Sequence, residues 1–274
     1  MIYNMYIYFI YLGVIKMKKP VMGIQLYTLR DYIKTAEDFD STLERLEKAG
    51  VRDVQISAIG DIAPEVQREI LDKHNMRVCV THKPLESILG DVDGMIAHHR
   101  TIGCDAIGLG WMPENERETR GGLIDFIKRL ENAAKKYKEN GISFNYHNHD
   151  FEFKPFDGGE NVMDVILSES DPGLFNFIPD VAWIDYAGFD PCEVLKRMKG
   201  RVKVVHFKDY VRDPEGKKHF VPLGEGVVDL EKCYDTVCEL EIPYVMYEQD
   251  DEWPDGDAFK ACEISWEYMK KLLK

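Results

Sequence analysis

Short apolar runs alternate along the chain with longer segments in which apolar residues recur every three or four positions. The short runs are rich in β-branched residues and lie at 21–26, 53–57, 77–81, 106–110, 142–147, 175–179, 202–207 and 244–248. Their length and composition predict strands, and the periodic segments between them predict amphipathic helices. A regular alternation of strands and helices is typical of βαβ units that build a parallel sheet.

The periodic segments predict eight helices, which begin near positions 35, 64, 94, 123, 162, 191, 230 and 258. In the first of them Phe39, Leu43 and Leu46 share one face, and Gly50 marks the helix end. Eight strand–helix units in roughly 250 residues predict a (β/α)8 barrel, the TIM barrel, as a single domain. The alternative is a doubly wound open sheet, but no predicted strand is followed by a G-x-G-x-x-G pattern.

Composition and charge limit the class of partner. The chain has 274 residues, of which 45% are apolar, and this is enough to bury one large core. Its formal net charge of -14 disfavours nucleic acid, because such binding depends on Lys and Arg that neutralise phosphates. We therefore expect an enzyme with a small-molecule substrate and no nucleic-acid partner. The oligomeric state stays open, with a homo-oligomer among the options.

The cysteines and the N-terminal residues bear on the compartment. The six cysteines are scattered without a C-x-x-C pair, which predicts reduced thiols in a cytoplasmic protein. Positions 1–15 are apolar and rich in Tyr and Ile, but they are fewer than the roughly 20 residues that span a bilayer. They also lack the basic region and cleavage site of a signal peptide. We interpret 1–19 as a disordered or misassigned extension, with no membrane partner, and 20–274 as the barrel.

Residues that bind metals stand at the ends of the last four predicted strands. The segment from Tyr146 to Phe153 reads YHNHDFEF and places two histidines and two carboxylates within six residues, directly after the fifth strand. The next three strands end at Asp180, His206 and Glu248. In a TIM barrel, active sites lie at the C-terminal mouth. These four strand ends are therefore expected to meet.

The alternation of side chains along each strand indicates which of these residues point inward. In the fifth strand His147 shares a face with Ser143 and Asn145, whereas the bulky neighbours occupy the other face. Asp180, His206 and Glu248 also fall on the expected inward face. Strands about 4.8 Å apart bring such side chains within reach of one ion. We predict one divalent ion, Mn²⁺, Co²⁺, Zn²⁺, Fe²⁺ or Mg²⁺, held by His147, Asp180, His206 and Glu248; ligand softness does not choose among these metals.

From Val21 onward the chain resembles the xylose isomerase-like barrel superfamily and, within it, the sugar phosphate isomerase/epimerase group. The resemblance is carried by the segments 23–31 (GIQLYTLRD), 146–153 (YHNHDFEF), 180–183 (DVAW), 187–191 (AGFDP), 206–209 (HFKD), 223–226 (LGEG) and 247–250 (YEQD). It implies a metal held by a Glu, an Asp, a His and a Glu from the last four strands. Asp180, His206 and Glu248 match this set, whereas His147 stands where relatives carry a glutamate.

This resemblance implies proton transfer on a small carbohydrate. In the epimerases of the superfamily the glutamates of strands five and eight are thought to be the two bases, so His147 puts a symmetric mechanism in doubt. We hypothesise that a hydroxy-ketone or hydroxy-aldehyde chelates the ion, which stabilises an enediolate. Glu248, or His147 together with Glu152, then moves the proton. The outcome is isomerisation or epimerisation of a ketose, an aldose or its phosphate.

Other polar and aromatic residues at the same end of the barrel are predicted to face the substrate. They are Gln25, His82, Trp111, His149, Trp183, Lys208, Asp209 and Glu225. For each of them the alternative is an ordinary packed or solvated role. His149 and Glu152 are also candidates to orient a ligating imidazole, because such a ring needs a partner for its other nitrogen.

Three other functions fit the same residues. The first is a metal-dependent lyase or dehydratase acting on a keto-sugar, a keto-inositol or a 3-keto-glycoside, for which one base is enough. The second is an endonuclease similar to the DNA repair branch of the superfamily, which the acidic charge disfavours. The third is a sugar-binding barrel without turnover.

Overall fold

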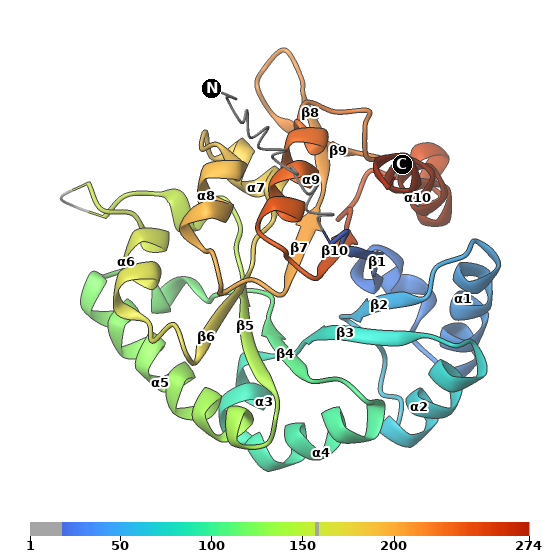
Figure 1. The fold of residues 1–274 in the computed structure, drawn as a ribbon, viewed down its shortest axis with the longest axis horizontal. Helices are drawn as coiled ribbons and strands as arrows, with labels where there is room; N and C mark the ends of the chain where they lie inside the picture. Colours follow the sequence, from blue (N-terminus) through green and yellow to red (C-terminus); the bar gives the residue numbers. More distant parts are fainter. Residues whose placement is uncertain (1–17, 157–158, 274) are drawn as a thin grey trace, which may run out of the picture.

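The computed structural model describes residues 18–156 and 159–273. Eight parallel strands form one sheet in the order β6-β5-β4-β3-β2-β1-β10-β7. Bridges between Phe177 and Val202 and between Asp180 and His206 join β6 to β7. Figure 1 shows the helices arranged around the outside of these strands. The predicted single-domain TIM barrel is confirmed, and the part of the extension up to residue 17 lies outside the described residues.

The barrel strands end within about two residues of the predicted boundaries. They are β1 (Val21–Gln25), β2 (Asp53–Ile56), β3 (Arg77–His82), β4 (Ala106–Leu109), β5 (Ser143–His147), β6 (Phe175–Ile178), β7 (Val204–Phe207) and β10 (Tyr244–Tyr247). The α-helices are α1 (Ala36–Lys48), α2 (Pro64–Lys73), α3 (Leu85–Gly90), α4 (Val92–Ile102), α5 (Arg120–Glu139), α6 (Val162–Glu169), α7 (Val181–Tyr186), α8 (Pro191–Arg197), α9 (Leu230–Glu239) and α10 (Ala258–Leu272).

Local sequence explains how the first helix is set. The Thr35 side chain accepts a hydrogen bond from the Asp38 amide, and the Asp38 carboxylate accepts one from the Thr35 amide, so both ends of a capping box are present. The predicted face of Phe39, Leu43 and Leu46 is buried against the barrel. This helix therefore begins directly after its cap, Thr35, and packs on the barrel with the apolar face that the periodicity predicts.

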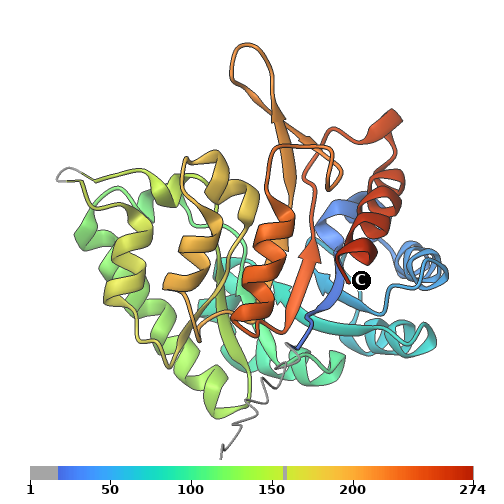
Figure 2. The same ribbon diagram turned by 45° about the horizontal axis from the view of Figure 1, so that its top comes forward.

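Two short helices were not predicted as separate elements, and the chain also forms a hairpin after β7. The helices α3 and α7 lie in the loops after β3 and β6, and each has only six residues, which is too short for a clear apolar period. The hairpin consists of β8 (Asp209–Arg212) and β9 (Lys218–Val221) and forms a separate antiparallel sheet. In Figure 2 it projects, in orange, beyond the rest of the molecule.

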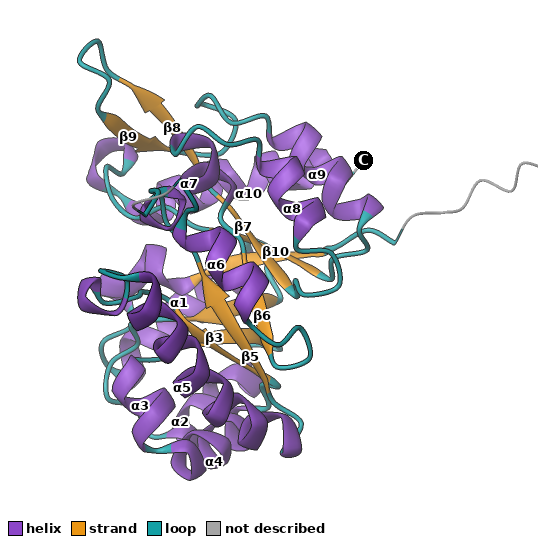
Figure 3. Cartoon of the chain, turned by 90° about the vertical axis from the view of Figure 1, so that its left-hand side faces the viewer, coloured by secondary structure: helices purple, strands orange, loops and turns teal. Residues whose placement is uncertain are grey.

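The core has an inner and an outer part. Inside the barrel a small cluster contains Cys79, Val80, Ala106, Ile178, Val204 and Met246. Much larger apolar clusters fill the space between the strands and the helices that cover them, and Figure 3 shows the helices on the outside of the orange strands. Because Ile178, Val204 and Met246 lie inside, the expected inward faces of β6, β7 and β10 are confirmed. Within 18–156 and 159–273, no helix is both long and apolar enough to cross a membrane.

Candidate metal centre and substrate cavity

Four metal-binding side chains meet at the C-terminal mouth of the barrel. One ligand atom each from His147, Asp180, His206 and Glu248 lies within 4.8 Å of the others, and all four residues are buried. His147 ends β5, Asp180 follows β6, His206 lies in β7 and Glu248 follows β10. The ends of neighbouring strands thus hold two imidazoles and two carboxylates around one point.

The His147 ring is oriented by the backbone. Its Nδ1 lies 3.2 Å from the carbonyl oxygen of Ile178, and because a carbonyl only accepts, Nδ1 carries the proton. Burial, followed by the neighbouring His206, holds the pKa of His147 well below its ordinary value, so the ring is neutral. The lone pair of Nε2 is then available to a metal, which neutral imidazole binds well.

The His206 ring lies between two acceptors. Its Nε2 lies 2.8 Å from Oε1 of Gln55, and its Nδ1 lies 3.1 Å from Oε2 of Glu248. A neutral imidazole donates to only one of them. If Nε2 donates to Gln55, the lone pair of Nδ1 is free to bind a metal. Two ligand atoms that each lie about 2.1 Å from one ion and subtend a right angle at it are about 3 Å apart. The distance between Nδ1 and Glu248 fits that arrangement.

Asp180 divides its two oxygens between the fold and the cluster. Oδ1 accepts hydrogen bonds of 3.0 Å from the amides of Ala182 and Trp183 and caps α7. Oδ2 is buried and accepts no hydrogen bond from the described residues, although Lys208 Nζ lies 3.1 Å away. Burial raises the pKa of Asp180, and Lys208 and His206 act against this rise. This oxygen faces the cluster with Lys208 as its charged partner, and a carboxylate oxygen has a second lone pair that is available to a cation.

Lys208 is the charged residue closest to this group. Its Nζ lies 3.1 Å from Asp180, 3.0 Å from Glu248 and 3.1 Å from Asp250, and its side chain is 1% exposed. Burial acts to lower the pKa of Lys208, but the three carboxylates outweigh it and the pKa rises well above its ordinary value. One ammonium leaves two of the three carboxylate charges without compensation. A divalent cation matches that charge, so the donors fit a metal of this kind.

A cavity of about 720 Å³ opens above the cluster. It is lined by residues from the loops after most of the barrel strands, including His82, Trp111, His149, Trp183 and Glu248. Three buried polar atoms of its lining have no hydrogen-bond partner among the described residues: His82 Nε2, His149 Nδ1 and Trp183 Nε1. Buried polar groups are nearly always paired, so these atoms are available to a bound ligand.

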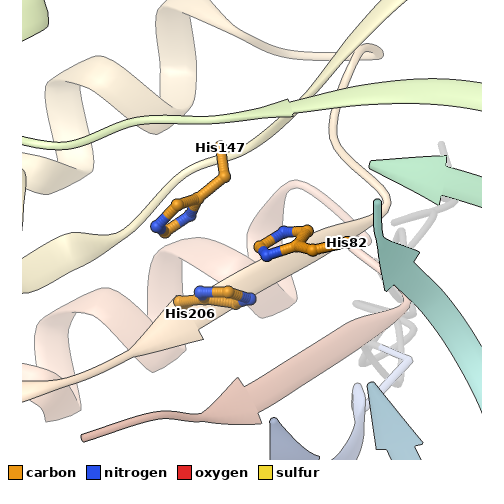
Figure 4. A group of neighbouring side chains, drawn as sticks. All are labelled: His82, His147 and His206. Atoms are coloured by element: carbon orange, nitrogen blue, oxygen red, sulfur yellow. The ribbon is translucent and has the colours of Figure 1, made fainter. Parts of the chain in front are cut away.

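His82 adds a third imidazole beside the cluster. The rings of His82, His147 and His206 gather from three strands and face one another in Figure 4, with centroids 4.6 to 5.7 Å apart. These residues form a second possible group of metal ligands. Burial lowers the pKa of His82 to about 3, so this ring is also neutral. Gly110 leaves room for it, because a Cβ there would lie 2.7 Å from His82 Nδ1.

The family description "Xylose isomerase-like TIM barrel" matches residues 43–264. The chain belongs to this family. An inosose dehydratase from Geobacillus kaustophilus is 23% identical over 195 residues, which cover 63% of this chain and 62% of that protein. An L-ribulose-5-phosphate 3-epimerase from Shigella flexneri is 32% identical over 93 residues, which cover 32% of each chain. The match thus spans less than two thirds of either of these two relatives.

A solved structure gives the same picture of the fold. A sugar phosphate isomerase/epimerase from Parabacteroides distasonis superposes with a TM-score of 0.75 at 22% identity, over 92% of this chain and 96% of that one. The chain is therefore a xylose isomerase-like barrel of the kind found in sugar isomerases, epimerases and dehydratases. Its buried His, Asp and Glu cluster is consistent with the metal site of such a family.

In this xylose isomerase-like barrel, Glu152 lies behind the cavity wall. It is fully buried, its Oε1 accepts a 2.5 Å hydrogen bond from the Tyr146 hydroxyl, and its Oε2 accepts one of 2.7 Å from the His149 amide. Burial raises its pKa to about 8. Glu152 is neither among the clustered donors nor among the residues that line the cavity. Through its hydrogen bond from the His149 amide, Glu152 holds the loop that carries His149.

The other predicted substrate residues divide into two groups. His82, Trp111, His149 and Trp183 line the cavity. Gln25, Lys208, Asp209 and Glu225 do not. Gln25 is buried, with its Nε2 3.5 Å from His82 Nδ1. Asp209 accepts hydrogen bonds from the amides of residues 210, 224, 226 and 228 and so holds the loop after β9, in which Glu225 is exposed.

Sequence reasoning missed three residues of this site. Gln55 contacts His206, Asn148 accepts a 3.1 Å hydrogen bond from the Asp180 amide, and Asp250 lines the cavity and contacts Lys208. Gln55 shows a usable signal, because it is a polar residue flanked by apolar ones in the middle of a barrel strand. Asn148 and Asp250 lie just past strand ends, where only the tertiary structure fixes the direction of a side chain.

Proposed function

We propose that the protein is a divalent-metal-dependent enzyme that moves a proton next to the carbonyl group of a small carbohydrate, as a sugar isomerase or epimerase. The observation that carries the proposal is the buried set of two imidazoles and two carboxylates at the floor of a 720 Å³ cavity. The family supports it, since the similar proteins named above are described as sugar epimerases or isomerases and as an inosose dehydratase.

The residues that would hold the ion are His147 through Nε2, Asp180 through Oδ2, His206 through Nδ1, and Glu248. A divalent ion bound there would polarise the substrate carbonyl as a Lewis acid and make the neighbouring C–H more acidic. Gln55 and the Ile178 carbonyl fix the two imidazoles from behind. This support keeps the ligating nitrogens directed at one point without the entropic loss of ordering free side chains.

Glu248 is the proposed base. It lines the cavity and is buried, and although burial acts to raise its pKa, the Lys208 ammonium holds that pKa well below the ordinary value. The carboxylate is therefore ionised at neutral pH and ready to accept a proton. His149 lines the cavity as well, and burial lowers its pKa to about 3. This neutral ring, fixed by Glu152 through its backbone, is placed to hydrogen-bond the substrate.

A lyase is the second candidate, and the replacement of the expected glutamate by His147 favours it. In this reaction Glu248 removes the proton next to the carbonyl, the C–H electron pair forms a C=C bond, and a hydroxide or alkoxide leaves from the adjacent carbon. The leaving group takes up a proton and departs as water or an alcohol. One base is sufficient, and a dehydration of this kind is consistent with the name of the Geobacillus relative.

The test combines metal content with proton exchange. The purified protein should contain close to one equivalent of a divalent metal, and His206→Ala should lose most of it, whereas His219→Ala, a histidine of the hairpin, should keep it. The metal-loaded protein should incorporate solvent deuterium into at least one member of a panel of ketoses, aldoses and keto-inositols. Glu248→Gln should slow exchange by a factor of about 100 or more. Conserved product mass identifies an isomerase, and loss of water or alcohol identifies a lyase.

Two results would refute the proposal. One is a protein that binds no divalent metal in any preparation. The other is a metal-loaded protein that exchanges no proton in any compound of the panel, which would leave the sugar-binding barrel without turnover as the better description.

A further inference from the structure

The cavity has two chemically different sides. The metal-binding donors come from β5, β6, β7 and β10. The loops after the first four strands contribute a mainly apolar wall to the lining, with Tyr27, Ile59, Pro84, Leu85, Leu109, Trp111 and Pro113. Because β1 to β4 are adjacent in the sheet, these residues form one continuous side of the mouth. A molecule that fills the cavity must therefore offer oxygen atoms to one side and apolar surface to the other.

Trp111 gives this wall an exposed aromatic surface. It is 55% exposed, although it is held edge-on against His149 and Phe151 with ring centroids 4.7 and 4.8 Å away. A large indole that is both fixed and exposed at the rim of a cavity is typical of a ligand contact. Ile59 and Leu85, from the loops after β2 and β3, are half-buried beside the same space.

The charges of the lining disfavour a phosphate group. Among the described lining residues Lys83 is the one cation, and its Nζ lies 3.0 Å from His98 Nε2. Burial lowers the pKa of Lys83 to about 8. Glu86, Glu248 and Asp250 are acidic members of the same lining, which includes no arginine. Phosphate recognition depends on Arg or Lys clusters, and these residues do not form one.

The size of the cavity agrees with a larger ligand. Its 720 Å³ falls within the roughly 300–1,000 Å³ that pockets for drug-sized ligands occupy. A sugar ring placed over the donor side would leave the apolar wall uncovered. That wall would then remain wet, at the usual cost of hydrating apolar surface.

We propose that the substrate is an unphosphorylated carbonyl sugar that carries an aromatic or similarly apolar substituent. Its oxygens lie over the donor side, and the substituent packs between Ile59, Leu85 and Trp111. The placement of the sugar rests on the proposed function, whereas the choice of substituent rests on the apolar wall alone.

The test measures binding to the metal-loaded protein by calorimetry. The probes are methyl 3-keto-β-D-glucopyranoside, its phenyl analogue and 3-keto-glucose 6-phosphate. The phenyl compound should bind about tenfold tighter than the methyl compound or more, because it buries an additional ring. The phosphate should bind no tighter than the methyl compound.

Variants locate the effect at the wall. Trp111→Ala should remove most of the advantage of the phenyl compound over the methyl compound, and Ile59→Ser should act in the same direction. The control is Tyr32→Ala, which removes another aromatic ring, 42% exposed, that packs against Phe259 and does not line the cavity. This control should keep the full preference.

The possible failures are distinguishable. Equal binding of phenyl and methyl compounds, or tightest binding of the phosphate, with proton exchange still measurable, overturns the substrate class and leaves the proposed function standing. A preference for the phenyl compound that survives Trp111→Ala and Ile59→Ser also overturns it. Preferential phenyl binding that depends on the wall, without proton exchange in any compound, supports the apolar contact and refutes the enzymatic function.

Discussion

At the scale of single residues, the two carboxylates that the sequence predicts to take part in proton transfer occupy different environments. Glu248 faces the cavity beside Lys208 and His206, and its pKa is held well below the ordinary value. Glu152 is enclosed with Tyr146, and burial raises its pKa to about 8. The neighbouring Lys208 ammonium keeps Glu248 ionised, whereas burial favours the proton on Glu152. Of the two, only Glu248 lines the cavity.

Glu152→Gln tests this difference through pH. Because the folded-state pKa of Glu152 is raised, its contribution to stability is fully present below the ordinary value near 4.5 and is lost as pH rises through about 8. An amide does not titrate, and it keeps both partners if its oxygen accepts from the His149 amide and its nitrogen donates to the Tyr146 hydroxyl oxygen. The variant should therefore gain about 2 kcal/mol or more relative to the wild type between pH 5 and pH 8, as each pKa unit corresponds to about 1.4 kcal/mol.

Urea unfolding at several pH values measures that gain. We expect the same variant to retain most of the catalytic rate, in contrast to Glu248→Gln. Identical pH slopes for variant and wild type would contradict the raised pKa. A stable Glu152→Gln protein without activity would restore Glu152 as a catalytic residue, as the sequence suggested.

At the scale of elements, the mouth of the barrel depends on loops that are fixed by single side chains. Asp209 begins β8 and accepts hydrogen bonds of 2.9 to 3.1 Å from four backbone amides, three of them in the loop after β9. Gly226 is required there, because a Cβ would lie 2.1 Å from Asp209 Oδ1. His219 of β9 links the hairpin to the segment after β10, because its Nδ1 lies 2.7 Å from Glu252; its Nε2 lies 3.0 Å from Asp213 in the turn of the hairpin.

Asp209→Ala should destabilise the protein by about 3 kcal/mol or more, because the amides that the carboxylate satisfied lose a charged acceptor. Chemical denaturation measures the change. Asp125→Ala provides the control, since that carboxylate is 80% exposed and should change stability by about 0.5 kcal/mol at most. Unchanged stability of Asp209→Ala, combined with weaker sugar binding, would show that Asp209 contacts substrate and would restore the original prediction.

At the scale of the whole molecule, the candidate metal centre lies where the strands of the C-terminal half meet and the barrel closes. Its donors come from β5, β6, β7 and β10, and the bridge between Asp180 and His206 joins β6 to β7, where the sheet closes into a ring. An ion at this point would tie together segments that are far apart in sequence. Bound metal should therefore stabilise the entire fold and not only the loops around it.

Saturating divalent metal should raise the thermal midpoint of the chelator-treated protein by roughly 5 °C or more, since a ligand at a hundred times its Kd contributes about 2.7 kcal/mol. Differential scanning calorimetry measures this shift. Asp180→Asn should reduce it strongly, because the amide lowers the negative charge of the donor set. A shift of the same size in that variant would place the stabilising ion elsewhere.

The sequence by itself determined the barrel and the four residues that cluster at its mouth. The apolar runs and helical periods are local properties, and the parity of each strand indicated which side chain points inward. His147, Asp180, His206 and Glu248 could therefore be chosen before any contact was known. The short helices α3 and α7 could not be predicted from the sequence, because six residues show too little periodicity.

The tertiary structure alone decided what surrounds those four residues. Lys208 sits between three carboxylates that follow two different strands, Gln55 reaches across the barrel to His206, and Glu152 turns away from the cavity. For Lys208 and Glu152 the outcome depends on side-chain directions past the strand ends, where alternation no longer applies. For Gln55, which lies within β2, it depends on which strand the closed barrel places opposite. Burial then shifts the pKa of the enclosed groups. The division of the cavity into a donor side and an apolar wall is likewise a consequence of closing the sheet into a ring.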